Sequence, residues 1–81
     1  MAEKTNQEKL RMLLPHWLEH NRNHQKEFRQ WLETARDQGL IATAASIEKA
    51  IKSMEETDRA LEEALEDLGG PLESGGHHHH H

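Results

Sequence analysis

Three histidines stand at four-residue intervals near the N-terminal end of the chain: His16, His20 and His24. On an α-helix a four-residue step advances about 40° beyond one full turn, so imidazoles at this spacing form a slowly winding ladder on one side. Glu27 lies three residues after His24 and adds a carboxylate at the end of the ladder. Neutral imidazole suits zinc, nickel, cobalt and copper, and two histidines one turn apart can chelate one ion. This pattern predicts a transition-metal site.

The segment around the ladder has the pattern of an amphipathic helix. Thr5 and Glu8 have the spacing of a capping box, which predicts a helix start at this point. Gly39 is the expected end of the helix. Pro15 removes one backbone hydrogen bond, so we expect a kink there, or a break after which a second helix opens at Pro15. The expected buried seam steps by four and three residues and holds two polar positions: Leu10, Leu14, Trp17, Asn21, His24, Phe28, Trp31 and Ala35.

A second amphipathic helix is expected from about residue 41 to residue 68. The run Gly69-Gly70-Pro71 should stop it. The alternation of apolar and polar residues that marks a strand is absent from the sequence. The expected seam of this helix contains one polar residue among apolar ones: Ala44, Ile47, Ile51, Met54, Asp58, Leu61, Leu65 and Leu68.

A short connection makes the two helices antiparallel, which predicts an all-α two-helix hairpin. When the residues of the two helices are matched outwards from the turn, His24 pairs with Met54 and Asn21 pairs with Asp58. We therefore expect Asp58 beside His20 and His24, where it or Glu27 could ligate the metal or orient an imidazole. His16 is expected to lie towards the flank of the helix, where it serves a partner chain or stays in solvent. The alternative is that His24 is a buried histidine bonded to Asp58 or Asn21 and the other two are surface residues.

A hairpin of this size has little hydrophobic core. Only 33% of the residues are hydrophobic, and there is no cysteine to form a disulfide. Small chains of this kind usually need oligomerisation or a metal to stay folded. Two helices also cannot cover both faces of Trp17, Phe28 and Trp31, so we expect a homodimer that forms a four-helix bundle.

The chain is expected to divide into three parts. Residues 1–4 are predicted to be a disordered N-terminus, residues 5–70 the helical hairpin, and residues 71–81 a linker and histidine purification tag. No apolar run reaches the ~20 residues of a membrane span, and no secretory leader is evident, so the cytoplasm is the expected location.

Other classes of function find little support in the sequence. The net charge is −5 and no basic cluster is present, which argues against a nucleic-acid partner. No Gly-rich phosphate loop or nucleophile motif accompanies the histidines, so we assign no catalytic residue.

The run from Leu14 to Asn21 contains the pattern Pro-His-Trp-x-x-His-Asn, which is followed by His24. With Phe28-Arg29-Gln30-Trp31 and the closing Leu65-Glu66-Asp67-Leu68-Gly69-Gly70, the chain resembles a family of small helical-hairpin proteins of uncharacterised function from anaerobic bacteria and archaea. The resemblance implies a natural helical family and supplies no activity or ligand.

Three hypotheses of function follow from the sequence, of which an enzyme, with a histidine as general base beside Asp58 or a metal with an open coordination site, ranks last. The first is a small metal-binding protein for storage, delivery or sensing, which holds zinc, nickel, cobalt or copper through His16, His20, His24, Glu27 and Asp58. The alternative is an oligomeric scaffold or interaction module, in which the layer of histidine, asparagine and aspartate only sets the helix register.

Overall fold

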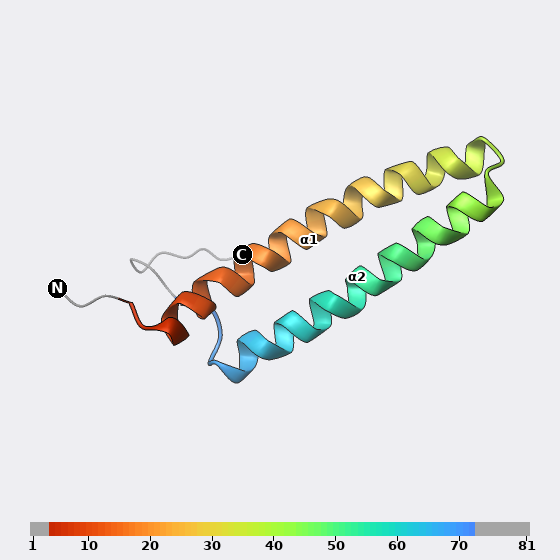
Figure 1. Cartoon of the computed structure of the whole chain (residues 1–81). Helices are drawn as coiled ribbons and strands as arrows, with labels where there is room; N and C mark the ends of the chain where they lie inside the picture. The colour runs from red at the N-terminus through yellow and green to blue at the C-terminus, as the bar shows by residue number, and fades with distance from the viewer. Residues whose placement is uncertain (1–3, 73–81) are drawn as a thin grey trace.

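The computed structural model describes residues 4–72 and contains two antiparallel α-helices, α1 (Asn6–Asp37) and α2 (Ile41–Asp67). The helices lie side by side along their whole length and are joined through residues 38–40 (Figure 1). No strand occurs within residues 4–72. The predicted all-α hairpin is confirmed. Residues 1–3 and 73–81 lie outside the described residues, and with them most of the predicted N-terminal tail and linker and the whole histidine tag.

Local sequence signals set the ends of α1 where they were expected. The Thr5 hydroxyl accepts a hydrogen bond from the Glu8 backbone N–H at 3.1 Å, and the Thr5 backbone N–H donates to the Glu8 carboxylate at 2.9 Å. This is the predicted capping box. At the other end Gly39 has φ +72°, a left-handed conformation that favours glycine. The chain reverses there, and the Leu40 backbone N–H donates to the Ala35 carbonyl at 2.9 Å.

The helix α1 continues through Pro15, so the alternative of a break at this residue is wrong. Proline in a helix interior leaves the carbonyl four residues earlier without its usual donor. The residues on both sides, Leu14 and Leu18, are buried against α2, with exposed fractions of 4% and 5%. This burial offsets the local cost of the missing hydrogen bond.

The observed seam of α2 is the predicted one. Its eight expected positions, from Ala44 to Leu68, are all buried or half-buried. In α1 the prediction was wrong at four positions, because Leu10, Trp17, His24 and Trp31 are exposed. After the last three of these positions, the residue that follows is buried instead: Leu18, Gln25 and Leu32.

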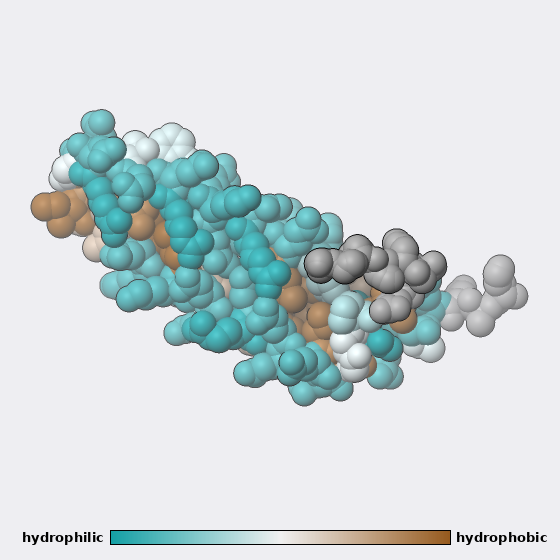
Figure 2. All heavy atoms as spheres, turned by 180° about the vertical axis from the view of Figure 1, so that it is seen from behind, coloured by the Kyte–Doolittle hydropathy of each residue, from teal (hydrophilic) through white to brown (hydrophobic). Residues whose placement is uncertain are grey.

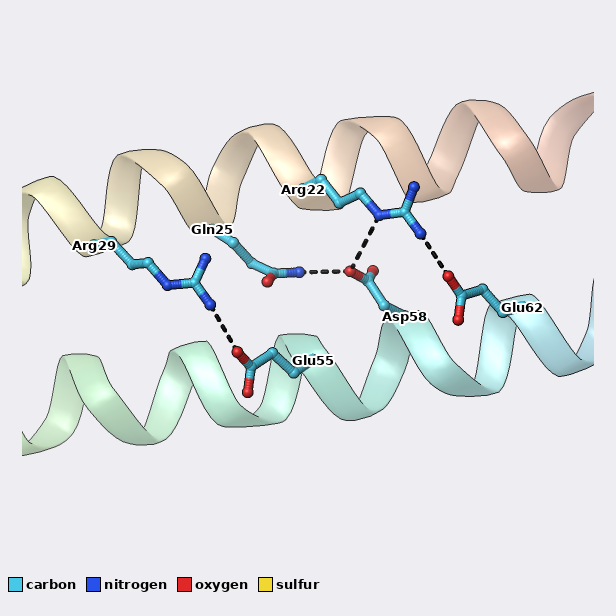
Figure 3. A network of polar contacts seen from close by, with 6 residues as sticks. All are labelled: Arg22, Gln25, Arg29, Glu55, Asp58 and Glu62. Carbon is cyan, nitrogen blue, oxygen red and sulfur yellow. Dashed lines mark hydrogen bonds and ion pairs between the residues drawn. The ribbon is translucent and has the colours of Figure 1, made fainter. Parts of the chain in front are cut away.

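The contacts across the hairpin are displaced from the predicted pairing by about one helical turn. Asp58 meets Gln25 rather than Asn21. Side chains on a helix lean towards its N-terminus, so facing side chains of antiparallel helices lean in opposite directions. Figure 3 shows Gln25 and Asp58 leaning in this way to reach each other. Pairing by backbone level alone therefore selects the wrong partner.

Candidate functional site

One polar layer interrupts the seam between the helices. The Gln25 side-chain amide donates to Asp58 Oδ2 at 2.6 Å, and Arg22 Nε lies 3.9 Å from the same oxygen. Gln25 and Asp58 are 5% and 9% exposed. The other carboxylate oxygen, Asp58 Oδ1, is buried without a hydrogen-bond partner. The structure thus places a buried polar layer at Asp58, but its partner is Gln25 and not Asn21, which the sequence pairing assigned to it.

The three histidines lie together along the exposed surface of α1. The ring centroids of His16 and His20 are 6.1 Å apart, and those of His20 and His24 are 5.0 Å apart with the rings edge to face. Glu27 Oε1 lies 4.0 Å from His24 Nδ1. The structure therefore brings His20, His24 and Glu27 together as a local cluster.

Asp58 does not belong to this cluster, since its contacts are with Gln25 and Arg22 in the seam. Within residues 4–72 no three histidine or carboxylate side chains gather closely enough to hold an ion. A single hairpin accordingly presents two neighbouring imidazoles, with a third one turn away at His16. A metal bound to one chain alone would need other ligands, such as water.

The two flanks of the seam differ in character. On one flank three arginines spaced seven residues apart on α1 pair with three glutamates spaced seven apart on α2. These charges are satisfied within the hairpin, and two of the pairs are drawn in Figure 3. The ion-pair flank consists of Arg22–Glu62 at 2.5 Å, Arg29–Glu55 at 2.7 Å and Arg36–Glu48 at 3.2 Å.

The opposite flank carries no aspartate, glutamate, lysine or arginine at the positions next to the seam. On α1 these positions hold large side chains and one histidine, and on α2 they hold small ones. We call this set the apolar flank: Leu10, Trp17, His24 and Trp31 on α1, with Thr43, Ala50, Thr57 and Ala64 on α2. The Trp31 side chain is the most open of its large members, with 60% of the residue exposed.

A hollow of about 400 Å³ opens in the apolar flank near the turn. It is large enough to receive an apolar side chain from another helix. Its lining is Phe28, Trp31, Thr43, Ser46, Ile47 and Ala50. Hydrophobic surface also appears elsewhere on the rod. Figure 2 shows it from behind as strips between hydrophilic side chains and as a patch at the turn, where Leu40 and Ile41 are 50% and 82% exposed.

Sequence reasoning missed Gln25 and the separation of the two flanks. Gln25 lies seven residues after Leu18 and seven before Leu32, so a heptad count beginning at Leu18 would have found it. The arginines and glutamates of the ion-pair flank show the same seven-residue spacing. Neither α1 nor α2 is apolar enough over a sufficient length to cross a bilayer.

Residues 10–68 match the model of a domain of unknown function, DUF8180, and the chain belongs to this family. The match agrees with the resemblance to an uncharacterised family, while the range of organisms and the histidine motif stay expectations. No curated protein and no solved structure matches the chain.

Proposed function

We propose that this DUF8180 protein is a non-enzymatic interaction module, and that two copies associate through their apolar flanks to form a four-helix bundle. The observation that carries this proposal is the exposure of Trp31, at 60%, on a flank without acidic or basic side chains. The opposite flank has its charges paired within the hairpin. An uncharged flank favours neither an acidic nor a basic partner.

The thin core of the hairpin supports association. Within residues 4–72 only six hydrophobic residues are buried, and none is below 2% exposure. A chain of this size needs further burial, a metal or disulfides to be stable, and it contains no cysteine. Removing on the order of 100 Å² of Trp31 surface from water would stabilise each chain by ~2–3 kcal/mol.

A second copy of the chain is the occupant that this flank suits best. Isologous contacts between identical faces are the commonest way in which soluble chains associate. The hollow beside Trp31 can receive an apolar side chain, and Leu13, which is 42% exposed, is one that a second copy would offer. The buried pair Gln25–Asp58 then fixes the register within each hairpin, as single polar layers do in coiled coils.

Sedimentation equilibrium tests the proposal, on a chain in which His77–His81 are replaced by serine. We expect a dimer. Trp31→Glu should weaken it by more than roughly 1,000-fold, because two indoles per dimer lose about 4–6 kcal/mol of burial. Circular dichroism checks that the variant stays helical.

The matched control is Gln30→Glu, which adds the same charge one residue away at an exposed position outside the apolar flank. This variant should dimerise like the parent chain. A parent chain that is monomeric at every concentration, or a Trp31→Glu dimer of unchanged affinity, would refute the proposal.

Metal binding is a second candidate function, for storage, delivery or sensing of a transition ion. The observation that favours it is the His20–His24 pair, with ring centroids 5.0 Å apart and a glutamate beside the second ring. An ion that binds only the folded chain must raise its melting temperature. Melts with zinc, nickel, cobalt and copper, on the chain without its terminal histidines, test this candidate; no shift with any ion would remove it.

A further inference from the structure

The histidine pair lies near the middle of the stripe of large side chains on α1. The stripe runs from Leu10 to Trp31, so its midpoint falls between His20 and Asn21, whereas the midpoint of His20 and His24 is Arg22. A twofold axis that overlays this stripe on its copy, with the two α1 helices antiparallel, therefore passes within about half a helical turn of the pair. In such a dimer the histidines of both copies meet.

The Glu27 carboxylate lies beside the second imidazole. Its Oε1 lies 4.0 Å from His24 Nδ1, a distance at which the carboxylate favours a proton on that nitrogen without a hydrogen bond. The lone pair is then on Nε2, the ring nitrogen away from Glu27. Carboxylates placed behind a ligating imidazole commonly have this role in metal sites.

One hairpin supplies too few ligands for a closed site. Structural zinc is held by four protein ligands in a tetrahedron, and the described part of the chain gathers no three histidine or carboxylate side chains closely enough to hold an ion. Two copies of the His20–His24 pair provide four imidazoles. The two Glu27 carboxylates would offset the charge of a divalent ion in an otherwise uncharged interface.

We infer that the dimer holds one transition-metal ion on its twofold axis, bound by His20 and His24 of both copies, with Glu27 as a positioning residue. This inference rests on the proposed self-association. Pairing His20 with the partner's His24 places Trp31 opposite the partner's Leu13, whereas the exact overlay of the stripe places it opposite Leu10. In either register an exposed leucine lies next to the hollow beside Trp31. The site takes ions that prefer imidazole, namely zinc, cobalt, nickel or copper.

The stoichiometry of cobalt and zinc binding tests this inference. The chain with His77–His81 replaced by serine is titrated with each ion by calorimetry, and cobalt is also followed by visible absorption. We expect one ion per two chains and the intense spectrum of tetrahedral cobalt. Zinc at 100 times its dissociation constant should tighten the dimer by roughly 100-fold in sedimentation, because the ion binds the dimer alone.

Variants separate this inference from the proposed function. His20→Gln with His24→Gln should abolish ion binding and with it the response of the dimer affinity to zinc, whereas His16→Gln, one turn away, should retain both the binding and the response. Glu27→Gln should weaken binding and keep the stoichiometry, which a merely structural role would not produce.

Three results would overturn the shared site. One ion per chain, with an affinity that does not change when the dimer dissociates on dilution, shows a site within one hairpin. Absence of binding by a chain that still dimerises removes the metal site alone. A chain that is monomeric both with and without ions removes the shared site and the proposed function together.

Discussion

The buried pair Gln25–Asp58 permits a quantitative test of the seam. Replacing Gln25 with leucine removes the amide that donates to Asp58 Oδ2 at 2.6 Å. The carboxylate would keep only the Arg22 contact at 3.9 Å, and its Oδ1 already has no partner. Stranding a buried charged acceptor costs more than the ~1–3 kcal/mol of a neutral group, so Gln25→Leu should lower the free energy of unfolding by about 3 kcal/mol.

Replacing both partners should reverse the loss. Gln25→Leu with Asp58→Leu leaves no buried charge, and the new leucines would continue the apolar seam formed by Leu18 and Leu32. Exchanges of this kind are often neutral, or stabilising by about 1–4 kcal/mol. The double variant should therefore be at least as stable as the parent chain. It should lose register specificity, because leucines can pair at several levels.

Urea unfolding followed by circular dichroism measures both changes, at one fixed protein concentration because association shifts apparent stability. In thermal melts the single variant should lose roughly 12–24 °C, at 4–8 °C per kcal/mol. Gln30→Leu, an exposed substitution on the same helix, is the control and should have little effect. A single variant as stable as the parent, or a double variant as unstable as the single one, would refute this account of the seam.

Three further changes test the backbone and the surface. Pro15→Ala should stabilise the chain by about 2 kcal/mol in urea unfolding, because α1 is continuous and gains a donor; destabilisation would contradict this. Gly39→Ala should cost ~1–2 kcal/mol from its φ of +72° alone, as nothing lies within 4 Å of an added Cβ; an unchanged midpoint would show that the turn can adjust. Arg29→Ala should cost less than ~1 kcal/mol, and the difference should shrink in about 1 M salt.

The features that local chemistry determines were predicted from the sequence. The capping box at Thr5 needs only residues within one turn, and the left-handed turn residue Gly39 needs only the absence of a side chain. The seam of α2 was also predicted correctly, including the buried Asp58. In this helix the large apolar residues occupy the seam almost alone, so its buried face is unambiguous.

The partner of Asp58 could not be obtained in the same way. Its identity depends on how far two side chains reach along the helix axes, and apolar periodicity contains no information about that reach. Gln25 also resembles a surface residue, since it lies between His24 and Lys26. The metal-site candidates were predicted with different success for this reason. The closeness of His20, His24 and Glu27 follows from their spacing on one helix, whereas the expected position of Asp58 depended on the pairing of the two helices.

The error in the seam of α1 has a physical meaning. Leu14 and Phe28 belong to both the predicted and the observed seam, whereas Trp17 and Trp31 extend the apolar surface to the side away from the ion pairs. The apolar surface of α1 is therefore wider than α2 alone can cover, and part of it stays in contact with water in the hairpin. Such a surface is typical of a helix with two packing partners in a bundle. The residues that misled the seam prediction are thus the ones a second copy would cover, and His24 lies among them.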